Sequence, residues 1–368
     1  MRDIFIVCNN FEELGGLQRW VHHVGRLFAA RGHQVHVIGV SHAEVPHTYG
    51  EDLPYELTVL HDSPPPRRRT GGLRGLRHRA VQRRGAATLS RMFRAARPGG
   101  VIIAAQVWAM EWVALADTAG MPVIGMSHES YQATKTSSRY ARVKRYFADA
   151  NRFLVLSAED ADSWARDHMS NADVMPNPLH VTPSAYPDLS QPVVELLGRL
   201  SFEKGQDMML EAWAEVIGRF PGWRLRLYGS GPDEEALHRQ AAELGLSESV
   251  EFPGTTADVE GALTQASIFA LSSRVEGFPM SVMEAMAYGL PTVAFDCAPG
   301  VRELITHESD GLIVRPGNTM EFAEELGRLM GDEGLRTKLG TQARSSVQRF
   351  SADVVIDRWE RMFELVGR

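Results

Sequence analysis

Residues 268–295 read IFALSSRVEGFPMSVMEAMAYGLPTVAF, and this stretch decides the fold class. A short apolar run, Ile268–Leu271, is followed by a polar loop, a helical pattern over Met280–Tyr288 and a second apolar run, Thr292–Phe295. Four-residue apolar runs bounded by turn residues are typical of strands that are buried on both faces, and a helix between two such strands is a parallel crossover. The stretch therefore predicts a parallel sheet with helices on its faces.

The same alternation of short apolar runs and amphipathic stretches continues over the rest of the chain. Before residue 176 the predicted elements are the strands Ile4–Cys8, Gln34–Val40, Val101–Ala105, Val123–Met126 and Phe153–Leu156 and a helix at Gly16–Arg31. After residue 192 they are the strands Val193–Leu197 and Arg224–Tyr228 and the helices Gln206–Arg219 and Glu234–Leu244. From about residue 320 to residue 366 the pattern is helical throughout. Strands that alternate with helices in this way predict doubly wound α/β sheets.

A proline-rich stretch divides the chain into two parts. Residues 176–192 contain five prolines, which exclude regular helix and favour an extended linker. The chain has 368 residues, more than a single hydrophobic core usually organises. We therefore predict two Rossmann-like domains, residues 1–182 and residues 193–350, and a terminal helix at residues 351–368.

Composition and charge limit the functional classes. The formal net charge is −7, so the molecule as a whole is not a general nucleic-acid binder. The two cysteines, Cys8 and Cys297, stand far apart in apolar runs, which excludes a disulfide framework and fits a reducing compartment. The N-terminal apolar run is too short for a signal peptide, and no apolar run reaches the roughly 18 residues that a membrane-spanning helix needs. We therefore expect a cytoplasmic protein without a nucleic-acid partner.

One segment has an unusual charge pattern. Residues 64–84 contain eight arginines and no acidic residue. The pattern has two interpretations: a solvated surface loop, or a patch that binds anionic lipid or a phosphate-bearing acceptor. On the second interpretation each arginine near an anionic membrane contributes about 1 kcal/mol. Arg67–Arg84 would then contact the inner membrane face, and the protein would be peripheral to it.

Doubly wound sheets bind ligands at the carboxyl ends of their strands, so the loops there are the first places to look for a site. The first such turn ends in Gly15-Gly16, which lets the backbone approach a ligand closely, and a helix start favours anions. The turn lacks the dinucleotide pattern Gly-x-Gly-x-x-Gly, which argues against an oxidoreductase. Residues 198–205, GRLSFEKG, place Arg199 and Lys204 between a strand and a helix, and two fixed cations there suit a diphosphate.

The strongest local pattern is SRVEGFPMSVMEA at residues 273–285. Pro279 stands where the first helical residue is expected, so the N–H groups of Met280 and Ser281 are candidates to hold phosphate or sugar hydroxyls. Glu284, inside the helix, offers a carboxylate that accepts two hydrogen bonds from a ribose diol. The structural alternatives are a helix cap for Glu276 and a solvated helix face for Glu284.

With these motifs, the chain resembles family 4 of the retaining glycosyltransferases, which has the GT-B fold, an α/β fold of two Rossmann-like domains facing across a cleft. The spacing Glu276-x7-Glu284 resembles the paired-glutamate signature of that family, and residues 198–205 resemble its Arg/Lys element. Four further motifs occur in the order usual for the family: Gly15-Gly16, Ser127-His128-Glu129, Pro176-Asn177-Pro178 and Asp310-Gly311-Leu312. Glu129 is a departure, because family members often carry aspartate after the histidine.

The resemblance implies a role for each matched residue. Glu284 would bind the donor ribose, and Glu276 would contact the hydroxyls of the transferred sugar. Arg199 and Lys204 would hold the diphosphate, and His128 would bind the sugar near its 6-position and the reacting centre; His128, Glu276, Arg199 and Lys204 form the expected catalytic set. Further donor contacts are implied for Gly15, Gly16, Gly229, Ser230, Phe252, Gly277, Phe278, Pro279, Met280 and Ser281.

The activity implied is that of a retaining hexosyltransferase that needs no cofactor and no metal. The donor is a UDP- or GDP-sugar, and the acceptor is a hydroxyl of a lipid-linked molecule or a cell-surface glycan. The chain has no Asp-x-Asp at a cleft strand end and no obvious carboxylate nucleophile, so the leaving phosphate is expected to assist deprotonation of the acceptor on the front face. The resemblance also implies that the terminal helix packs back on the first domain through Trp359, Met362 and Phe363.

Several alternatives remain at this point. The acceptor is instead a small natural product, or the protein is a nucleotide-sugar epimerase on the same fold, which would turn over the donor alone. A silent sugar-nucleotide-binding scaffold has no chemical need for all five of Arg199, Lys204, Glu276, Glu284 and His128. A dehydrogenase would have to bind NAD.

Overall fold

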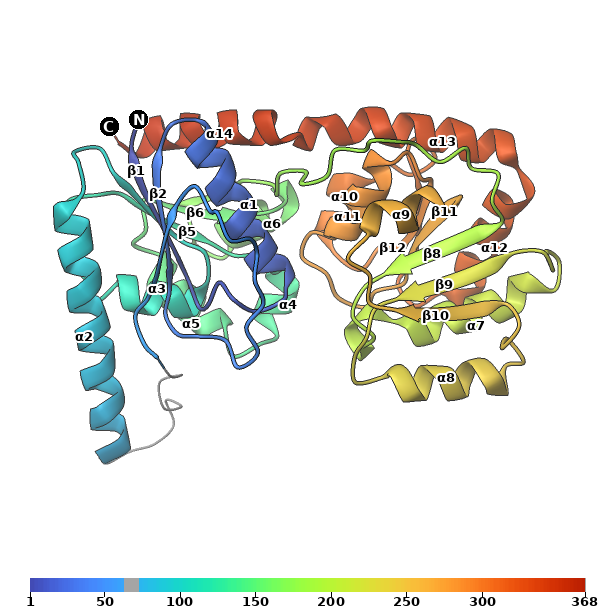
Figure 1. The fold of residues 1–368 in the computed structure, drawn as a ribbon, viewed down its shortest axis with the longest axis horizontal. Coiled ribbons are helices and arrows are strands. Elements are labelled where there is room, and N and C mark those ends of the chain that lie inside the picture. Colours follow the sequence, from blue (N-terminus) through green and yellow to red (C-terminus); the bar gives the residue numbers. More distant parts are fainter. Residues whose placement is uncertain (63–72, 368) are drawn as a thin grey trace. The chain divides into compact units, whose positions relative to one another are not determined.

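The computed structural model describes residues 1–62 and 73–367, which form two compact units (Figure 1). Unit 1 comprises Met1–Pro178 together with Ala352–Arg368, and unit 2 comprises Leu179–Ser351. Arg67, Arg68 and Arg69 of the arginine-rich segment lie outside the described residues.

Unit 1 is built on a parallel sheet whose seven strands have the order β3-β2-β1-β4-β5-β6-β7. In chain order these strands are β1 (Asp3–Cys8), β2 (Gln34–Gly39), β3 (Glu56–Val59), β4 (Val101–Ala104), β5 (Val123–Met126), β6 (Arg152–Val155) and β7 (Ala172–Val174). The helices of the unit are α1 (Gly16–Ala30), α2 (Leu73–Ala95), α3 (Val107–Val113), α4 (Tyr131–Lys135), α5 (Tyr140–Phe147), α6 (Ala158–Arg166) and α14 (Ala352–Val366). Strand β4 is buried along its whole length because helices cover both faces of the sheet.

The last helix of the chain, α14, packs on the first helix, α1, within unit 1. Trp359 is fully buried and its ring lies 5.8 Å from that of Phe28 and 6.4 Å from that of Trp20. Phe363 packs on Phe28 as well, at 5.4 Å between ring centroids. The aromatic face of α14 therefore completes the hydrophobic core that α1 begins.

Unit 2 repeats the architecture with a six-stranded parallel sheet of order β10-β9-β8-β11-β12-β13. The strands are β8 (Val193–Leu197), β9 (Arg224–Tyr228), β10 (Val250–Gly254), β11 (Ile268–Leu271), β12 (Thr292–Phe295) and β13 (Leu312–Val314). The helices are η1 (Phe202–Lys204), α7 (Gln206–Ile217), α8 (Glu234–Glu243), α9 (Val259–Thr264), α10 (Met280–Ala287), α11 (Pro299–Leu304), α12 (Thr319–Gly331), α13 (Glu333–Ser346) and η2 (Val347–Phe350). The predicted α/β class with two Rossmann-like sheets is confirmed.

The proline-rich stretch contains neither helix nor strand, as its prolines predicted, but from Leu179 onward it packs as part of unit 2 and is not a free linker. Unit 1 ends at Pro178, before the expected boundary at residue 182. The N–H of Leu179 donates to the carbonyl of Phe350 at 2.7 Å, and the guanidinium of Arg336 donates to the carbonyl of Leu189 at 3.1 Å. An extended segment keeps its backbone polar groups free for such partners, so this one docks along the unit.

The arginine-rich segment also differs from the sequence expectation. Residues 73–84 of the arginine-rich segment belong to helix α2, so the loop interpretation is wrong for them; arginine favours helices, and α2 contains no proline. Arg79, Arg83 and Arg84 are exposed on this helix. The C-terminal region is helical from Thr319 to Val366, as predicted, and the backbone leaves the helical region only at Asp332 and at Ser351.

Strand β8 buries a carboxylate. Glu195 is fully buried and points to the opposite face of the sheet from its core-forming neighbours Val194 and Leu196. Neither carboxylate oxygen has a hydrogen-bond partner among the described residues, and the neighbouring Arg226 pairs instead with Glu251 at 2.8 Å. Burial raises the pKa of Glu195 to about 8, against a smaller lowering by the charge of Arg226.

We expect Glu195→Gln to remove a pH dependence of stability. Below the ordinary pKa of 4.5 the carboxyl is protonated in both the folded and the unfolded chain, so it costs nothing there. Between that value and about 8 the unfolded chain ionises first, so the free energy of unfolding falls by up to about 1.4 kcal/mol per pH unit. Thermal unfolding near pH 5 and near pH 8 checks this. Between these two pH values the Tm of the wild type should fall more than that of Glu195→Gln. The prediction would be contradicted if both fell equally, or if the exposed control Glu243→Gln reduced the fall as much as Glu195→Gln does.

Candidate functional site

The site in unit 2 is built from two loops at the carboxyl edge of the sheet. The loop after β8 and the loop after β11 touch at Gly205, whose φ of 64° is in the left-handed region and whose missing Cβ would lie 2.1 Å from the carbonyl oxygen of Ser272. The Ser272 hydroxyl donates to the carbonyl of Lys204 at 3.2 Å, and the N–H of Arg274 donates to that of Glu203 at 2.8 Å. Only glycine at position 205 permits this close approach.

This contact brings together two of the predicted catalytic residues. Nζ of Lys204 lies 2.6 Å from Oε1 of Glu276, which also accepts a hydrogen bond from the Ser273 hydroxyl at 2.7 Å. The Glu276 side chain is only 9% exposed, so its carboxylate is held in a position that is largely shielded from solvent. Arg199 is exposed at the end of β8, and its carbonyl accepts from the side chain of Gln206 at 2.8 Å. A paired cation and carboxylate at one strand end can hold a phosphate and a hydroxyl side by side.

The second glutamate of the signature, Glu284, lies on α10 and has a partner that sequence reasoning missed. Nε2 of His180 lies 2.5 Å from Oε1 of Glu284, and the Glu284 side chain is 6% exposed. The alternative of a solvated helix face is therefore wrong for Glu284. No motif could have identified His180, because it lies in the proline-rich stretch, far from Glu284 in the sequence.

Two of the predicted donor residues, Gly229 and Ser230, lie in the loop that follows β9, at the carboxyl edge of the same sheet. The φ of Gly229 is 139°, and a Cβ there would lie 1.9 Å from the carbonyl oxygen of Gly198. The carbonyl of Ser230 accepts from the N–H of Leu200 at 3.0 Å, which holds the loops after β8 and β9 together. Phe252 lies on β10, with its ring 4.1 Å from that of His238.

The turn that begins α10 differs in two details from the expectation. Pro279 is the residue before the helix instead of its first residue, and its carbonyl accepts from the N–H of Val282 at 3.1 Å. Phe278 is buried against Phe350, at 5.5 Å between ring centroids, so its side chain anchors the turn from inside. The carbonyl oxygen of Gly277 packs against Gly300 of α11. A Cβ on Gly300 would lie 2.0 Å from that oxygen. Met280 and Ser281 follow in the first turn, both partly exposed.

The thiol of Cys297 lies near Glu276. Burial raises the pKa of Cys297 to about 12, and the nearby charge of Glu276 adds to the effect. The thiol therefore stays protonated at neutral pH and offers no nucleophile beside Glu276.

Unit 1 carries a pocket of about 220 Å³ that is lined by residues from the carboxyl ends of β1, β4 and β5. Its polar lining includes Asn9, Gln106, His128, Glu129, Thr134 and Arg139. The N–H of Asn9 donates to the side-chain oxygen of Gln106 at 2.9 Å, and Arg139 pairs with Glu129 at 2.7 Å. His128 is thus at the edge of the sheet where the sequence placed it.

The environment of His128 decides its chemistry. Its ring packs edge-on against Trp20 with 4.7 Å between ring centroids, and its Nε2 is buried without a hydrogen-bond partner among the described residues. Burial lowers the pKa of His128 to about 3, so the ring is neutral over the physiological range. His128 is therefore suited to hydrogen bonding and not to acting as a cationic acid.

The Gly15-Gly16 turn of unit 1 is held by a tyrosine that sequence reasoning missed. The N–H of Gly15 donates to the hydroxyl of Tyr49 at 3.3 Å, and that hydroxyl donates to the carbonyl of Glu13 at 2.8 Å. A Cβ on Gly16 would meet nothing within 4 Å, so the start of α1 is open to a ligand. Tyr49 in turn stacks on the buried His22 at 4.3 Å between ring centroids.

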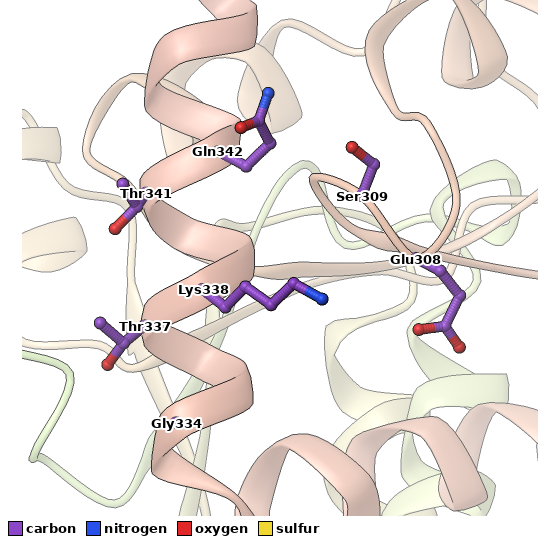
Figure 2. A pocket seen from close by; sticks show the side chains of 7 residues that line it. All are labelled: Glu308, Ser309, Gly334, Thr337, Lys338, Thr341 and Gln342. Atoms are coloured by element: carbon purple, nitrogen blue, oxygen red, sulfur yellow. The ribbon is translucent and has the colours of Figure 1, made fainter.

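A second hollow lies elsewhere in unit 2. Glu308 and Ser309 form one side of it and α13 the other, with Lys338 reaching across, and its volume is about 580 Å³ (Figure 2). Glu308 is already paired with Arg328 at 2.8 Å. None of the predicted site residues lines this hollow.

Two further observations concern the described part of the chain only. Within residues 1–62 and 73–367, no three His, Cys, Asp or Glu side chains gather closely enough to hold a metal ion. No helix in the same ranges is both long and apolar enough to cross a bilayer.

Fold and site define the class: an α/β protein of two Rossmann-like units with charged side chains and glycines gathered at the carboxyl ends of the strands. The family model of the glycosyl transferases group 1 matches residues 186–346, and that of glycosyltransferase family 4 matches residues 14–182. An uncharacterized glycosyltransferase of Haemophilus influenzae is 30% identical over 237 residues, which are 63% of this chain and 67% of that protein. The chain therefore belongs to the group 1 glycosyltransferases of family 4.

Other relatives match over shorter parts of their own length. An exopolysaccharide phosphotransferase of Streptomyces coelicolor is 37% identical over 224 residues, 58% of this chain but 24% of the relative. The poly(glycerol-phosphate) alpha-glucosyltransferase of Bacillus subtilis is 26% identical over 207 residues, 56% of this chain and 30% of the relative. This chain thus spans about a quarter and about a third of these two proteins.

Solved structures show the same fold. S. aureus TarM, in complex with UDP, superposes with a TM-score of 0.80 at 13% identity, covering 99% of this chain and 100% of that one. Anabaena HepE, in complex with UDP and glucose, superposes with a TM-score of 0.78 at 19% identity over the same shares of the two chains. The likeness identifies the GT-B fold.

Proposed function

We propose that this protein transfers a hexosyl unit, with retention, from a UDP- or GDP-sugar to a hydroxyl of a lipid-linked or cell-surface-glycan acceptor. The observation that carries the proposal is the pairing of Lys204 with Glu276 at the strand edge where Glu284 follows in the next helix. The names of the relatives, which act on exopolysaccharide and on poly(glycerol phosphate), support an acceptor of the cell surface.

The donor roles follow from charge and burial. A buried carboxylate such as Glu284 accepts hydrogen bonds from two neighbouring hydroxyls, as a ribose presents them, and His180 fixes its orientation. Glu276 keeps one oxygen engaged with Lys204 and Ser273, so the carboxylate is oriented before a sugar arrives. Gly229 lets the loops after β8 and β9 approach each other closely, because a Cβ there would lie 1.9 Å from the carbonyl oxygen of Gly198. Gly229 and Ser230 would contact the nucleotide from this loop.

The chemistry proposed is a front-face displacement without a metal. The acceptor oxygen bonds to the anomeric carbon while the bond from that carbon to the diphosphate oxygen breaks on the same face, and the hydroxyl proton passes to the departing diphosphate. Arg199 and Lys204 offset the charge that develops on this leaving group. Neutral His128 donates or accepts a hydrogen bond at the sugar. A covalent sugar trapped on Glu276 would refute this mechanism.

We further propose a peripheral position at the cytoplasmic face of a membrane. Arg79, Arg83 and Arg84 are exposed on α2, and each basic residue near an anionic surface contributes about 1 kcal/mol.

Glu284→Gln tests the donor site. We expect the variant to bind its nucleotide sugar about 10- to 100-fold more weakly, because a charge-assisted hydrogen bond contributes about 1.5–3 kcal/mol. UDP- and GDP-sugars are screened by thermal shift and by donor hydrolysis, with the exposed Glu324→Gln of α12 as the matched control.

The possible results separate the alternatives. Binding of one donor in the wild type and in the control, weakened in Glu284→Gln, identifies the base and the sugar. Conversion of the donor to a different nucleotide sugar without an acceptor would show an epimerase instead of a transferase. Unweakened binding by Glu284→Gln would remove Glu284 from the donor site.

A further inference from the structure

The pocket of unit 1 contains polar atoms that the protein itself does not satisfy. Oδ1 of Asn9, Nε2 of His128 and Oγ1 of Thr134 are buried and have no hydrogen-bond partner within the described ranges. Thr134 as a whole is 1% exposed. A buried polar group without a partner is costly, so three of them around one pocket indicate a site that a ligand with several hydroxyls completes.

The size and the walls of the pocket restrict that ligand. Its volume of about 220 Å³ is below the roughly 300–1,000 Å³ of pockets for drug-sized molecules, so one sugar or polyol unit fits and a longer chain must extend outwards. Leu17, Met126 and Val143 supply apolar walls between the polar atoms. An apolar wall with a few fixed polar groups is the usual surface for the C–H face of a carbohydrate.

A cation lies at the edge of the pocket. Residues 131–147, which form α4 and α5 with the turn between them, contain five lysines and arginines and no acidic residue. Two of these cations are held by carboxylates of other elements: Arg142 by the buried Glu111 at 2.6 Å and Lys144 by Asp167 at 3.0 Å. These two are committed to the fold.

Arg139 is different, because its pair is exchangeable. It pairs with Glu129 at 2.7 Å, and the two side chains are 52% and 39% exposed. Exposed ion pairs contribute only about 0–1 kcal/mol, so a ligand anion can replace Glu129 at little cost. The guanidinium matches the oxygens of a phosphate in a bidentate arrangement better than an ammonium does.

We propose that this pocket is the acceptor subsite and that it takes a phosphorylated polyol or sugar unit. Arg139 binds the phosphate after releasing Glu129, and Asn9 and Thr134 bind the hydroxyls of the same unit. The inference rests on the proposed transferase activity and names its acceptor class. The same chemistry occurs in a polymer of polyol phosphates and in the headgroup of a glycerophospholipid.

The test measures binding to the full chain by calorimetry. The probes are sn-glycerol 3-phosphate, glycerol as the uncharged analogue and inorganic phosphate as the anion alone. We expect glycerol phosphate to bind more tightly than either analogue. Arg139→Gln should weaken its binding about tenfold or more, whereas Glu129→Gln should strengthen it. Thr134→Val should weaken the binding of both polyols.

Arg145→Gln is the matched control, because Arg145 is an exposed arginine of the same helix α5 that does not line the pocket. Equal losses in Arg139→Gln and Arg145→Gln would show a diffuse surface charge and overturn the proposal. Binding no tighter than that of inorganic phosphate would overturn it as well. UDP binding is measured in every variant: if the wild type fails to bind any nucleotide while glycerol phosphate behaves as expected, the proposed transferase activity fails and the polyol phosphate site stands.

A second arm distinguishes the sources of the ligand. Vesicles that contain phosphatidylglycerol are sedimented with the wild type and with Arg139→Gln. Sedimentation that Arg139→Gln abolishes supports the lipid headgroup, and binding of the soluble probe without sedimentation supports the polymer.

Discussion

Lys204→Met is expected to lower kcat about 10²–10³-fold, with a smaller effect on the affinity for UDP. The reason is that Lys204 stands at the strand edge where the diphosphate would depart, so its charge opposes the negative charge that grows as the bond to the sugar breaks. Removing one preorganised donor to such a charge typically costs about 2.7–4 kcal/mol of transition-state stabilisation. Single-turnover rates and UDP binding by calorimetry measure the two effects separately.

The structure suggests a competing explanation, in which Lys204 only compensates the charge of Glu276, and a second variant can reveal it. Glu276 is 9% exposed, so without Lys204 its carboxylate keeps only the Ser273 hydroxyl as a partner, and an uncompensated buried charge is destabilising. In the double variant Lys204→Met/Glu276→Gln no charge is left unpaired. If Lys204 serves the phosphate, the double variant stays as slow as the single one or becomes slower. Recovery of activity in the double variant would show that Lys204 is only the counter-ion of Glu276.

The control for general charge effects is Lys338→Met. Lys338 is an exposed lysine of unit 2 that borders the hollow between α13 and Glu308 (Figure 2). It should keep the wild-type rate. A rate for Lys204→Met within about threefold of that control would contradict the assignment of Lys204 to the leaving group.

The sequence predicted the strands whose side chains are apolar on both faces. Ile268–Leu271 and Thr292–Phe295 have the predicted bounds, because central parallel strands read as nearly continuous apolar runs. Val193–Leu197 also has the predicted bounds, although Glu195 interrupts its apolar run. The prediction missed strands at the ends of the sheets. β3 (Glu56–Val59) is half exposed and shows no apolar run, and β7 (Ala172–Val174) has three residues, too few for a pattern.

Side-chain partners were predictable only within a motif. The spacing of Glu276 and Glu284 on one loop and helix is a local property of the chain. The ion pair of Lys204 with Glu276 and that of His180 with Glu284 join segments that approach each other only when the sheet forms. Likewise, the glycine at position 205 is visible in the sequence, but the carbonyl that excludes a Cβ there belongs to Ser272. Contacts between loops depend on strand order, which no single motif encodes.

Trp359→Ala is expected to lower the free energy of unfolding of unit 1 by about 3–5 kcal/mol. Trp359 is fully buried, and its ring packs on Phe28, Trp20 and Phe363 at 5.7–6.4 Å between centroids. Truncation leaves a cavity that the rigid helices α1 and α14 fill only partly. Urea unfolding followed by fluorescence checks this, with Val354→Ala, a residue that is 42% exposed on the same helix, as the control.

Trp359→Phe separates the size of the ring from its polarity. The indole Nε1 of Trp359 has no hydrogen-bond partner among the described residues, so phenylalanine removes volume without leaving a new unsatisfied group. We expect this variant to lose less than half as much stability as Trp359→Ala. Equal losses in the two variants would contradict the cavity explanation.

The effect should also reach the pocket of unit 1, because the contacts form a continuous chain. Trp359 packs on Trp20, and Trp20 packs edge-on against His128 at 4.7 Å. Once Trp359 is truncated, Trp20 can move towards the cavity, and the ring of His128 loses the support that keeps it buried and neutral. The pKa of His128 in Trp359→Ala should therefore rise from about 3 towards its ordinary value of 6.5, which NMR titration of the ring measures. An unchanged pKa in a variant that is destabilised as expected would show that α14 stabilises the core of unit 1 without positioning His128.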